Sequence, residues 1–146
     1  MFTVSDIAQK IRRPDEEIGQ AVTRVRNWTK EGLLRPSGKA HTGTGNAREY
    51  STEAVVDAFL IETFVQCFGS KAVLVPPYLK QLRPYFLSPK HAGKFLLIGR
   101  TSGDPDFRFE ACTPNALSNA IKSINCQTYM LLDIGQLTER LALGEK

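Results

Sequence analysis

The sequence has 146 residues, of which 42% are hydrophobic and 23% are charged, and these values exclude a disordered chain, a fibrous repeat and a large multidomain enzyme. Its 19 Lys and Arg against 15 Asp and Glu give a formal charge of +4, which favours an anionic partner. No apolar run approaches the roughly 18 residues of a membrane span, and Asp6 and Gln9 interrupt the region where a secretory signal would be apolar. We therefore expect a cytoplasmic protein without a membrane partner.

Two helices are predicted at the start of the chain. Thr3, with Asp6 three residues later, is typical of a capping box, and apolar residues follow with helical spacing as far as Ile11. Pro14, followed by three acidic residues, predicts the start of a second helix that runs to about Glu31. The apolar residues of this second helix share one face. Its polar residues are left largely outward: Gln20, Thr23, Arg24, Asn27 and Lys30.

A loop and a third helix complete the N-terminal half. Residues 35–50 contain three glycines, a proline and many small or hydroxylated residues without apolar periodicity, so an exposed hairpin or loop is predicted. Ser51 and Thr52 are suitable caps for a third helix, and Gly69 is expected to end it. The sequence therefore indicates an N-terminal domain at 1–69 and a second domain at 70–146.

The C-terminal half predicts a small domain with the order ββαβα. A short helix after Pro76 is expected to stop before Pro84, because proline disrupts a helix interior. Two apolar segments then flank a turn-rich stretch, which predicts an antiparallel hairpin, and Pro114 begins another helix. The three strands are expected at 95–98, 107–112 and 129–134. The predicted fold class is therefore α+β.

Basic and acidic residues are segregated along the sequence. The segment from Gln20 to Arg48 has six basic residues and a single acid, Glu31, whereas residues 49–66 contain four acids and no base. A second basic segment without acids covers residues 67–100. A charge run is usually a solvated surface, so these segments need a structural context before they indicate a partner.

Three segments of the N-terminal half resemble the MerR-type DNA-binding domain. They are TVSDIA at residues 3–8, VRNWTKEGLL at 25–34 and REYS at 48–51. In that family the first segment is the opening helix, the second ends the recognition helix, and the third closes the wing. The resemblance covers roughly residues 2–68 and implies a winged helix-turn-helix. The sequence departs from the family in a longer segment between residues 8 and 19, in Asn27 at a usually aromatic position, and in a stretched wing.

The resemblance implies a bacterial, nucleoid-associated transcriptional regulator that binds double-stranded DNA. It places Arg24 and Arg26 on the recognition helix and Arg48 and Tyr50 at the wing edge. Arg suits guanine, Asn and Gln suit adenine, and any nearby cation attracts phosphate. The candidate DNA-binding residues are Gln20, Thr23, Arg24, Arg26, Asn27, Lys30, Lys39, His41, Thr42, Thr44, Asn46, Arg48 and Tyr50.

We expect a homodimer formed through residues 70–146, acting on a palindromic operator. The apolar runs at 95–98 and 130–132 do not alternate strictly with polar residues, so they need cover on both faces, which a second subunit would supply. An architectural or excisionase-like DNA-binding protein, which depends more on DNA bending, is the alternative. A third hypothesis is a protein-interaction adaptor whose working part is the C-terminal domain.

Catalysis, metal binding and cofactor binding have no support in the sequence. Cys67, Cys112 and Cys126 contain no CxxC pair, and His41 and His91 have no metal-ligand spacing. No nucleophile lies beside a general base, and residues 99–104 lack the Lys-Ser/Thr pair of a phosphate loop. We therefore expect neither an enzyme nor a cofactor or metal site, and a small-molecule ligand of the C-terminal domain stays open.

Overall fold

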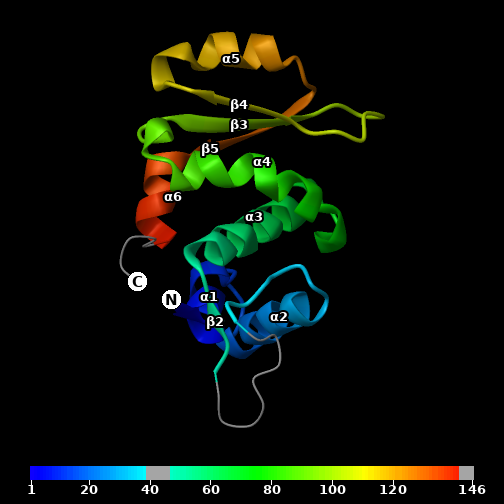
Figure 1. The fold of residues 1–146 in the computed structure, drawn as a ribbon. Coiled ribbons are helices and arrows are strands. Elements are labelled where there is room, and N and C mark those ends of the chain that lie inside the picture. Colours follow the sequence, from blue (N-terminus) through cyan, green and yellow to red (C-terminus); the bar gives the residue numbers. More distant parts are fainter. Residues whose placement is uncertain (39–46, 142–146) are drawn as a thin grey trace. The chain divides into compact units, whose positions relative to one another are not determined.

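The computed structural model describes residues 1–38 and 47–141 and has an α+β fold (Figure 1). These residues divide into two compact units, Met1–Arg83 with Leu141, and Pro84–Arg140. Residues 70–83, which the sequence analysis assigned to the C-terminal domain, therefore pack with the first unit. Among the described residues, no helix is both long and apolar enough to cross a lipid bilayer.

The first unit begins with a two-residue strand, β1 (Phe2–Thr3), and helix α1 (Val4–Ile11). The predicted capping box is confirmed: Thr3 accepts a hydrogen bond from the Asp6 backbone N–H, and the Asp6 carboxylate accepts one from the Thr3 backbone N–H. One face of the helix is buried through Ile7, Ala8 and Ile11. The capping residues and the spacing of the apolar residues thus both support a helix at this position.

Helix α2 spans Ile18–Lys30, so the expectation that it begins at Pro14 is wrong. Pro14 and Asp15 lie in a turn instead. The carboxylate of Glu16 accepts a hydrogen bond from the Arg13 backbone N–H at 3.0 Å, which closes this turn. Glu17 is the N-cap of α2. The acidic run therefore belongs to the turn before the helix and not to its first turn.

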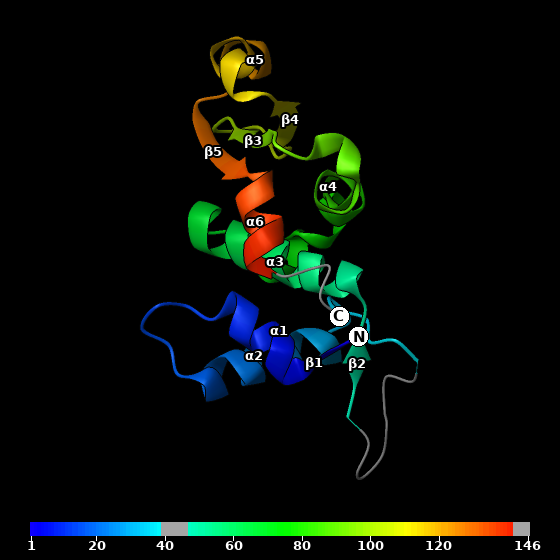
Figure 2. The same cartoon turned by 90° about the vertical axis from the view of Figure 1, so that its left-hand side faces the viewer.

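Strand β2 (Glu49–Tyr50) pairs antiparallel with β1, with Phe2 opposite Tyr50 (Figure 2). The Ser37 backbone N–H donates to the Glu49 carbonyl at 2.7 Å, and the two residues form an antiparallel bridge. The bridge closes the base of the segment between them, in agreement with the predicted hairpin or loop. Residues 39–46 at its centre lie outside the described part of the chain.

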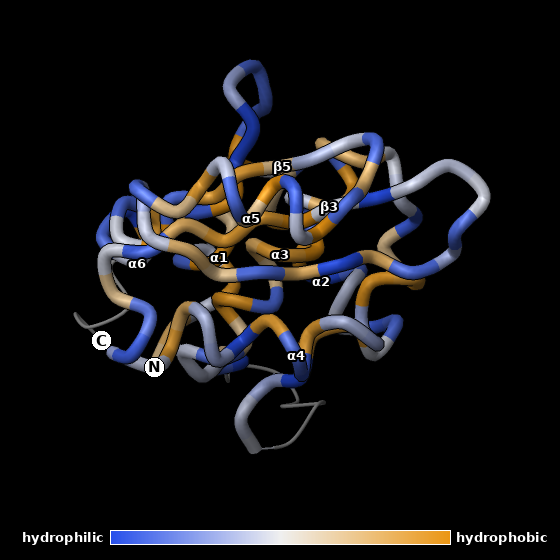
Figure 3. The backbone as a smooth tube through the Cα atoms, turned by 90° about the horizontal axis from the view of Figure 1, so that it is seen from above, coloured by the Kyte–Doolittle hydropathy of each residue, from blue (hydrophilic) through white to orange (hydrophobic). Residues whose placement is uncertain are grey.

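Helix α3 (Thr52–Phe68) is the longest helix in the first unit and appears mostly hydrophobic in Figure 3. Both predicted ends are confirmed: the Ser51 hydroxyl accepts from the Ala54 N–H at 3.3 Å, and Gly69 follows in the left-handed conformation at φ 64°. Its buried apolar residues form the core of the unit with those of α1 and α2.

Helix α4 spans Pro76–Leu87 after a short 3-10 turn, η1 (Ala72–Leu74), and the boundary between the units falls inside it. The expectation that Pro84 stops this helix is wrong. Pro84 has no N–H to donate to the preceding turn, but its own carbonyl still accepts from the Ser88 N–H at 3.0 Å. The helix therefore loses one bond and continues for another turn.

The second unit contains an antiparallel sheet of three strands in the order β4-β3-β5. The strands are β3 (Phe95–Arg100), β4 (Arg108–Cys112) and β5 (Thr128–Asp133). Helices α5 (Leu117–Ile124) and α6 (Ile134–Leu141) precede and follow β5. The predicted hairpin and the ββαβα order are confirmed.

Helix α5 covers one face of this sheet, as Figure 1 shows. Leu97, Cys112, Ala120 and Ile124 form the buried cluster between them. Gly99 is required for this packing, because a Cβ there would lie 2.6 Å from the Cys126 Sγ. Sequence periodicity predicted the helix and strands, but it did not predict this close approach.

Strand β3 is buried within one chain. Leu96, Leu97 and Ile98 are at most 1% exposed. The expectation that a second subunit must cover this strand is therefore wrong, since the chain covers it. On β5, in contrast, Leu131 is 43% exposed.

Candidate nucleic-acid interface

The solvent-facing side of α2 contains polar and basic residues, and the helix has no acid. Ala21, Val25 and Trp28 are buried on the opposite side, which fixes how the helix is turned. Residues 20, 23, 27 and 30 recur at helical intervals of three and four, so they share one surface. Five candidate residues are exposed on this helix: Gln20, Thr23, Arg26, Asn27 and Lys30.

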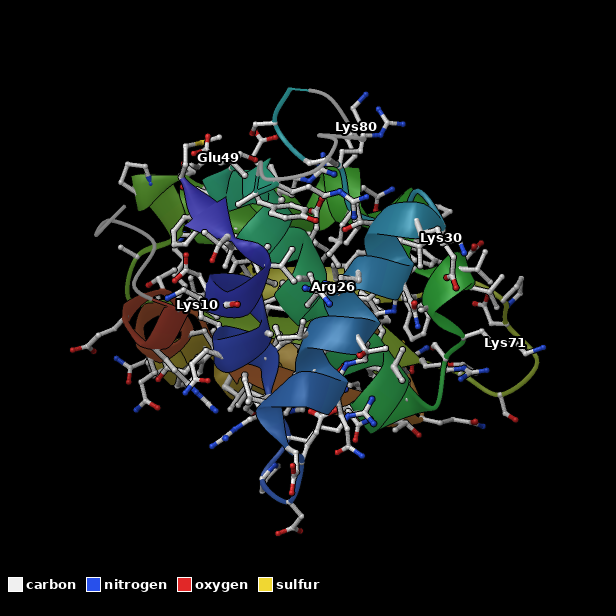
Figure 4. The ribbon with its side chains drawn as sticks, turned by 90° about the horizontal axis from the view of Figure 1, so that it is seen from below. Lys10, Arg26, Lys30, Glu49, Lys71 and Lys80 are labelled. Atoms are coloured by element: carbon white, nitrogen blue, oxygen red, sulfur yellow. The ribbon has the colours of Figure 1, made fainter. Side chains whose placement is uncertain are left out.

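Figure 4 shows Arg26 near the centre of the face formed by α1 and α2, with Lys10 on α1 and Lys30 on α2 to its sides. Lys10 was not among the sequence-predicted candidates, because a lysine in the last turn of a short helix also fits a solvated residue that complements the helix dipole. The Lys10 ammonium lies 5.5 Å from the centre of the Phe2 ring. This contact holds the ammonium near the Phe2 ring of β1, on the α1 side of this face.

The exposed residues of α2 differ in how far they are already engaged. The Gln20 side-chain carbonyl accepts from the Glu17 backbone N–H at 3.2 Å, and the Thr23 hydroxyl donates to the Gly19 carbonyl at 2.9 Å. With the described residues, Arg26, Asn27 and Lys30 form no side-chain hydrogen bond or ion pair. These three side chains are therefore the ones available to a ligand.

Arg24 is not directed outward, and this expectation of the sequence analysis is wrong. Its side chain is only 15% exposed, and its Nε lies 3.1 Å from the Glu62 Oε2. The same guanidinium donates to both carboxylate oxygens of Glu16. Arg24 packs inward because two acids, one before α2 and one on α3, compensate its charge.

Arg13 extends this group into an ion cluster of four residues: Arg13, Glu16, Arg24 and Glu62. The Arg13 Nε donates to the Glu62 Oε1 at 2.6 Å. The hydrogen bond from Arg24 lowers the pKa of Glu16 to about 2, so this carboxyl is ionised at neutral pH. The cluster joins the turn before α2, α2 itself and α3, and it thereby fixes the orientation of the exposed α2 face.

Tyr50 is fully buried, so its side chain is not at the surface that the resemblance implied. Its hydroxyl lies 2.7 Å from the Thr29 Oγ1, and Thr29 in turn donates to the Val25 carbonyl at 3.0 Å. A phenol with a buried partner is typical of a structural residue. This bond connects α2 with the strand that ends the loop.

The loop candidates are described only in part. Arg48 is half-buried. Five further candidates lie outside the described residues: Lys39, His41, Thr42, Thr44 and Asn46. Arg35, at the start of the loop, is exposed and adds a further basic side chain to the first unit.

A polar hollow of about 430 Å³ lies between the start of the loop, α3 and the first-unit part of α4. Its charged lining includes Asp57 and Arg83, which pair through two bonds of 2.6 and 2.8 Å. Because these charges compensate each other, the hollow offers little net attraction to an ion. We therefore place the candidate interface on α2.

No model of a known protein family matches the chain, and no curated protein matches it.

Proposed function

We propose that the protein is a sequence-specific DNA-binding transcriptional regulator that acts as a homodimer on a palindromic operator. In this proposal, residues 1–69 form a MerR-type winged helix-turn-helix. Helix α2 is its recognition helix, and the loop closed by Ser37 and Glu49 is its wing. The observation that carries the proposal is the exposed, acid-free face of α2, whose Arg26, Asn27 and Lys30 form no side-chain bond with the described residues.

These three side chains match the groups that DNA presents. The major groove, about 12 Å wide, admits an α-helix. An amide such as that of Asn27 pairs with the donor and acceptor of adenine, and a guanidinium such as that of Arg26 pairs with the two acceptors of guanine. Lys30 and Lys10, near the ends of α2 and α1, are placed to neutralise phosphates.

The buried groups have a supporting role in this proposal. The ion cluster around Arg24 holds α2 against α3, and the bond between Thr29 and Tyr50 connects α2 with the base of the wing. Base contacts require side chains on a rigid element, because small displacements weaken hydrogen bonds steeply. We therefore assign Arg24 and Tyr50 to positioning and not to DNA contact.

Two copies are part of the proposal for an energetic reason. One small domain neutralises few phosphates and contacts a single half-site. Two linked domains add their interactions over a palindrome, so the second contact becomes intramolecular. The homodimer thereby supplies the operator affinity that a single domain lacks.

The test is a titration of the full chain with double-stranded DNA at several salt concentrations. We expect affinity to fall steeply with salt, because each neutralised phosphate releases counterions. Genomic capture and footprinting then determine whether a discrete palindromic site is protected. A salt-independent affinity, or no binding, overturns the proposal, whereas binding that bends DNA without a discrete site favours the architectural alternative.

A further inference from the structure

Strand β5 is an outer strand of the three-stranded sheet, as Figure 2 shows for the second unit. The Ile134 N–H donates to the Lys94 carbonyl at 3.1 Å, one step beyond the pair of Asp133 with Phe95. Hydrogen-bonded pairs alternate along an antiparallel ladder, so Leu132 and the other even-numbered residues of β5 bond to β3. The odd-numbered residues therefore direct their backbone groups to the other edge of β5, where no strand within residues 1–38 and 47–141 pairs.

Three residues are presented at this edge: Tyr129, Leu131 and Asp133. The first two direct both their N–H and C=O outward, while Asp133, which caps α6 by accepting from the Gln136 N–H at 3.1 Å, offers its N–H. Leu131 is 43% exposed and Tyr129 is 36% exposed. An unpaired strand edge with exposed apolar side chains is suited to pairing with another strand.

The other outer strand differs from β5 in the way expected of a protected edge. β4 places two charged side chains, Arg108 and Glu110, within its five residues. Between Thr128 and Leu132, in contrast, β5 contains no charged residue and no proline. Charges and prolines are the usual devices that prevent edge-to-edge pairing, and this part of β5 has neither.

The pattern of β5 is complementary to itself. A two-fold axis perpendicular to the sheet keeps each side chain on its own face, so opposite residues must both be odd-numbered or both even-numbered. One residue at the axis must then lie opposite its own copy. If this residue is Leu131, all three outward residues of β5 are paired. Leu131 then meets its own copy, Met130 meets Leu132, and Tyr129 meets Asp133.

We propose that two copies of this chain associate through antiparallel pairing of their β5 strands about a two-fold axis at Leu131, which joins the two sheets. This inference rests on the proposed function only for the requirement of two copies. The paired strands bury the exposed Leu131 against itself and satisfy the outward backbone groups on both copies.

The charges near β5 favour a second copy as the occupant. Identical strands bring like charges together unless the register separates them, and here the two Asp133 carboxylates lie at opposite ends of the pair. An open groove of about 560 Å³ along Leu131 and Leu132 is flanked by Glu139 and Arg140 of α6. Both signs therefore line the groove on each copy, so the association of two copies does not set two edges of a single charge sign against each other.

The test is the mass of the full chain, without DNA, by light scattering and analytical ultracentrifugation at micromolar concentration. We expect a dimer. Leu131→Pro removes an N–H that points away from β3, so the sheet is retained while two hydrogen bonds of the dimer are lost. The dimer Kd is expected to rise at least about thirtyfold. Ile121→Lys, which removes an exposed apolar side chain of α5, is the matched control and is expected to stay dimeric.

A cross-linking variant tests the register and does not depend on tolerance of proline. In a Cys67→Ser background, Leu131→Cys is expected to form a disulfide between copies on mild oxidation, because opposed hydrogen-bonded residues have Cα atoms about 5.5 Å apart. Ile121→Cys is expected to stay uncross-linked. A monomeric full chain, an unchanged Kd for Leu131→Pro or equal cross-linking at both positions overturns the proposal. Since DNA is absent throughout, failure of DNA binding leaves these outcomes unaffected.

Discussion

Arg24 on α2 lies 3.1 Å from Glu62 on α3, between its Nε and the Glu62 Oε2. These residues are 38 positions apart in the sequence, and Glu62 is 10% exposed. A residue whose spacing placed it on the recognition surface is thus an internal connection between two helices. The distinction matters because an internal arginine affects folding, whereas an exposed arginine affects binding.

Arg24→Ala is expected to destabilise the first unit by about 3 kcal/mol, because it leaves Glu16 without its main partner and Glu62 with Arg13 alone. Equilibrium denaturation in urea measures this change. Arg26→Ala, on the exposed side of the same helix, is the matched control and is expected to change stability by no more than about 0.5 kcal/mol. Equal losses for the two variants would contradict the internal role of Arg24.

Acid is expected to destabilise the first unit through Glu16. Its pKa is lowered from 4.5 to about 2 in the folded chain, so the unfolded chain binds the proton more readily. The stabilisation is therefore complete above pH 4.5 and is lost as the pH falls toward 2. Denaturation measured across this interval is expected to show a shallower pH dependence for Glu16→Gln. Asp15→Asn, in the adjacent exposed turn, is expected to keep the original slope.

Substitutions of Asn27 and Lys30 are expected to change DNA affinity in different ways. Asn27→Ala should lose about 1–3 kcal/mol on the operator and little on random DNA, because only a base contact discriminates between sequences. Lys30→Ala should weaken both alike and reduce the salt dependence by about one phosphate. Fluorescence anisotropy with both DNAs measures these differences. Equal losses on both DNAs for Asn27→Ala would assign it to the backbone.

Features governed by neighbours in sequence were predictable. The capping box at Thr3, the cap at Ser51 and the left-handed Gly69 all follow from groups within a few residues. The start of α2 was predicted wrongly because it depends on a contact that is not local. The acidic residues after Pro14 suit a helix N-terminus, but Glu16 pairs with Arg24, and no local pattern identifies this partner.

Charge pairing was the part of the site that sequence reasoning could not supply. The acids of residues 49–66 are separate from any base in the sequence. In the fold, however, Asp57 is buried against Arg83, and Glu62 is buried against Arg13 and Arg24, all of which are distant in the sequence. Periodicity reports which face is apolar, but it does not report which charge is compensated across helices. Removing these paired charges leaves Arg26 and Lys30 as the basic side chains of the α2 face.

The pair of Asp57 and Arg83 permits a last test. The pH dependence of stability distinguishes the effect of the Arg83 charge from that of its side-chain packing. Burial raises the pKa of Asp57, and the hydrogen bonds from Arg83 oppose that change. Arg83→Met removes the opposition, so ionised Asp57 is left buried at a cost of about 2 kcal/mol, reduced because a third of the Arg83 side chain is exposed.

A raised pKa in the folded chain means that the folded chain binds the proton more readily, so stability falls as the pH rises above the ordinary value of 3.8. The loss in Arg83→Met is therefore expected to grow between mildly acidic and neutral pH, as measured by urea denaturation. Adding Asp57→Leu should recover most of the lost stability, because it removes the uncompensated carboxylate. A loss that is the same at every pH, or that the second substitution does not relieve, would show that Arg83 acts through packing of its aliphatic stem and not through its charge.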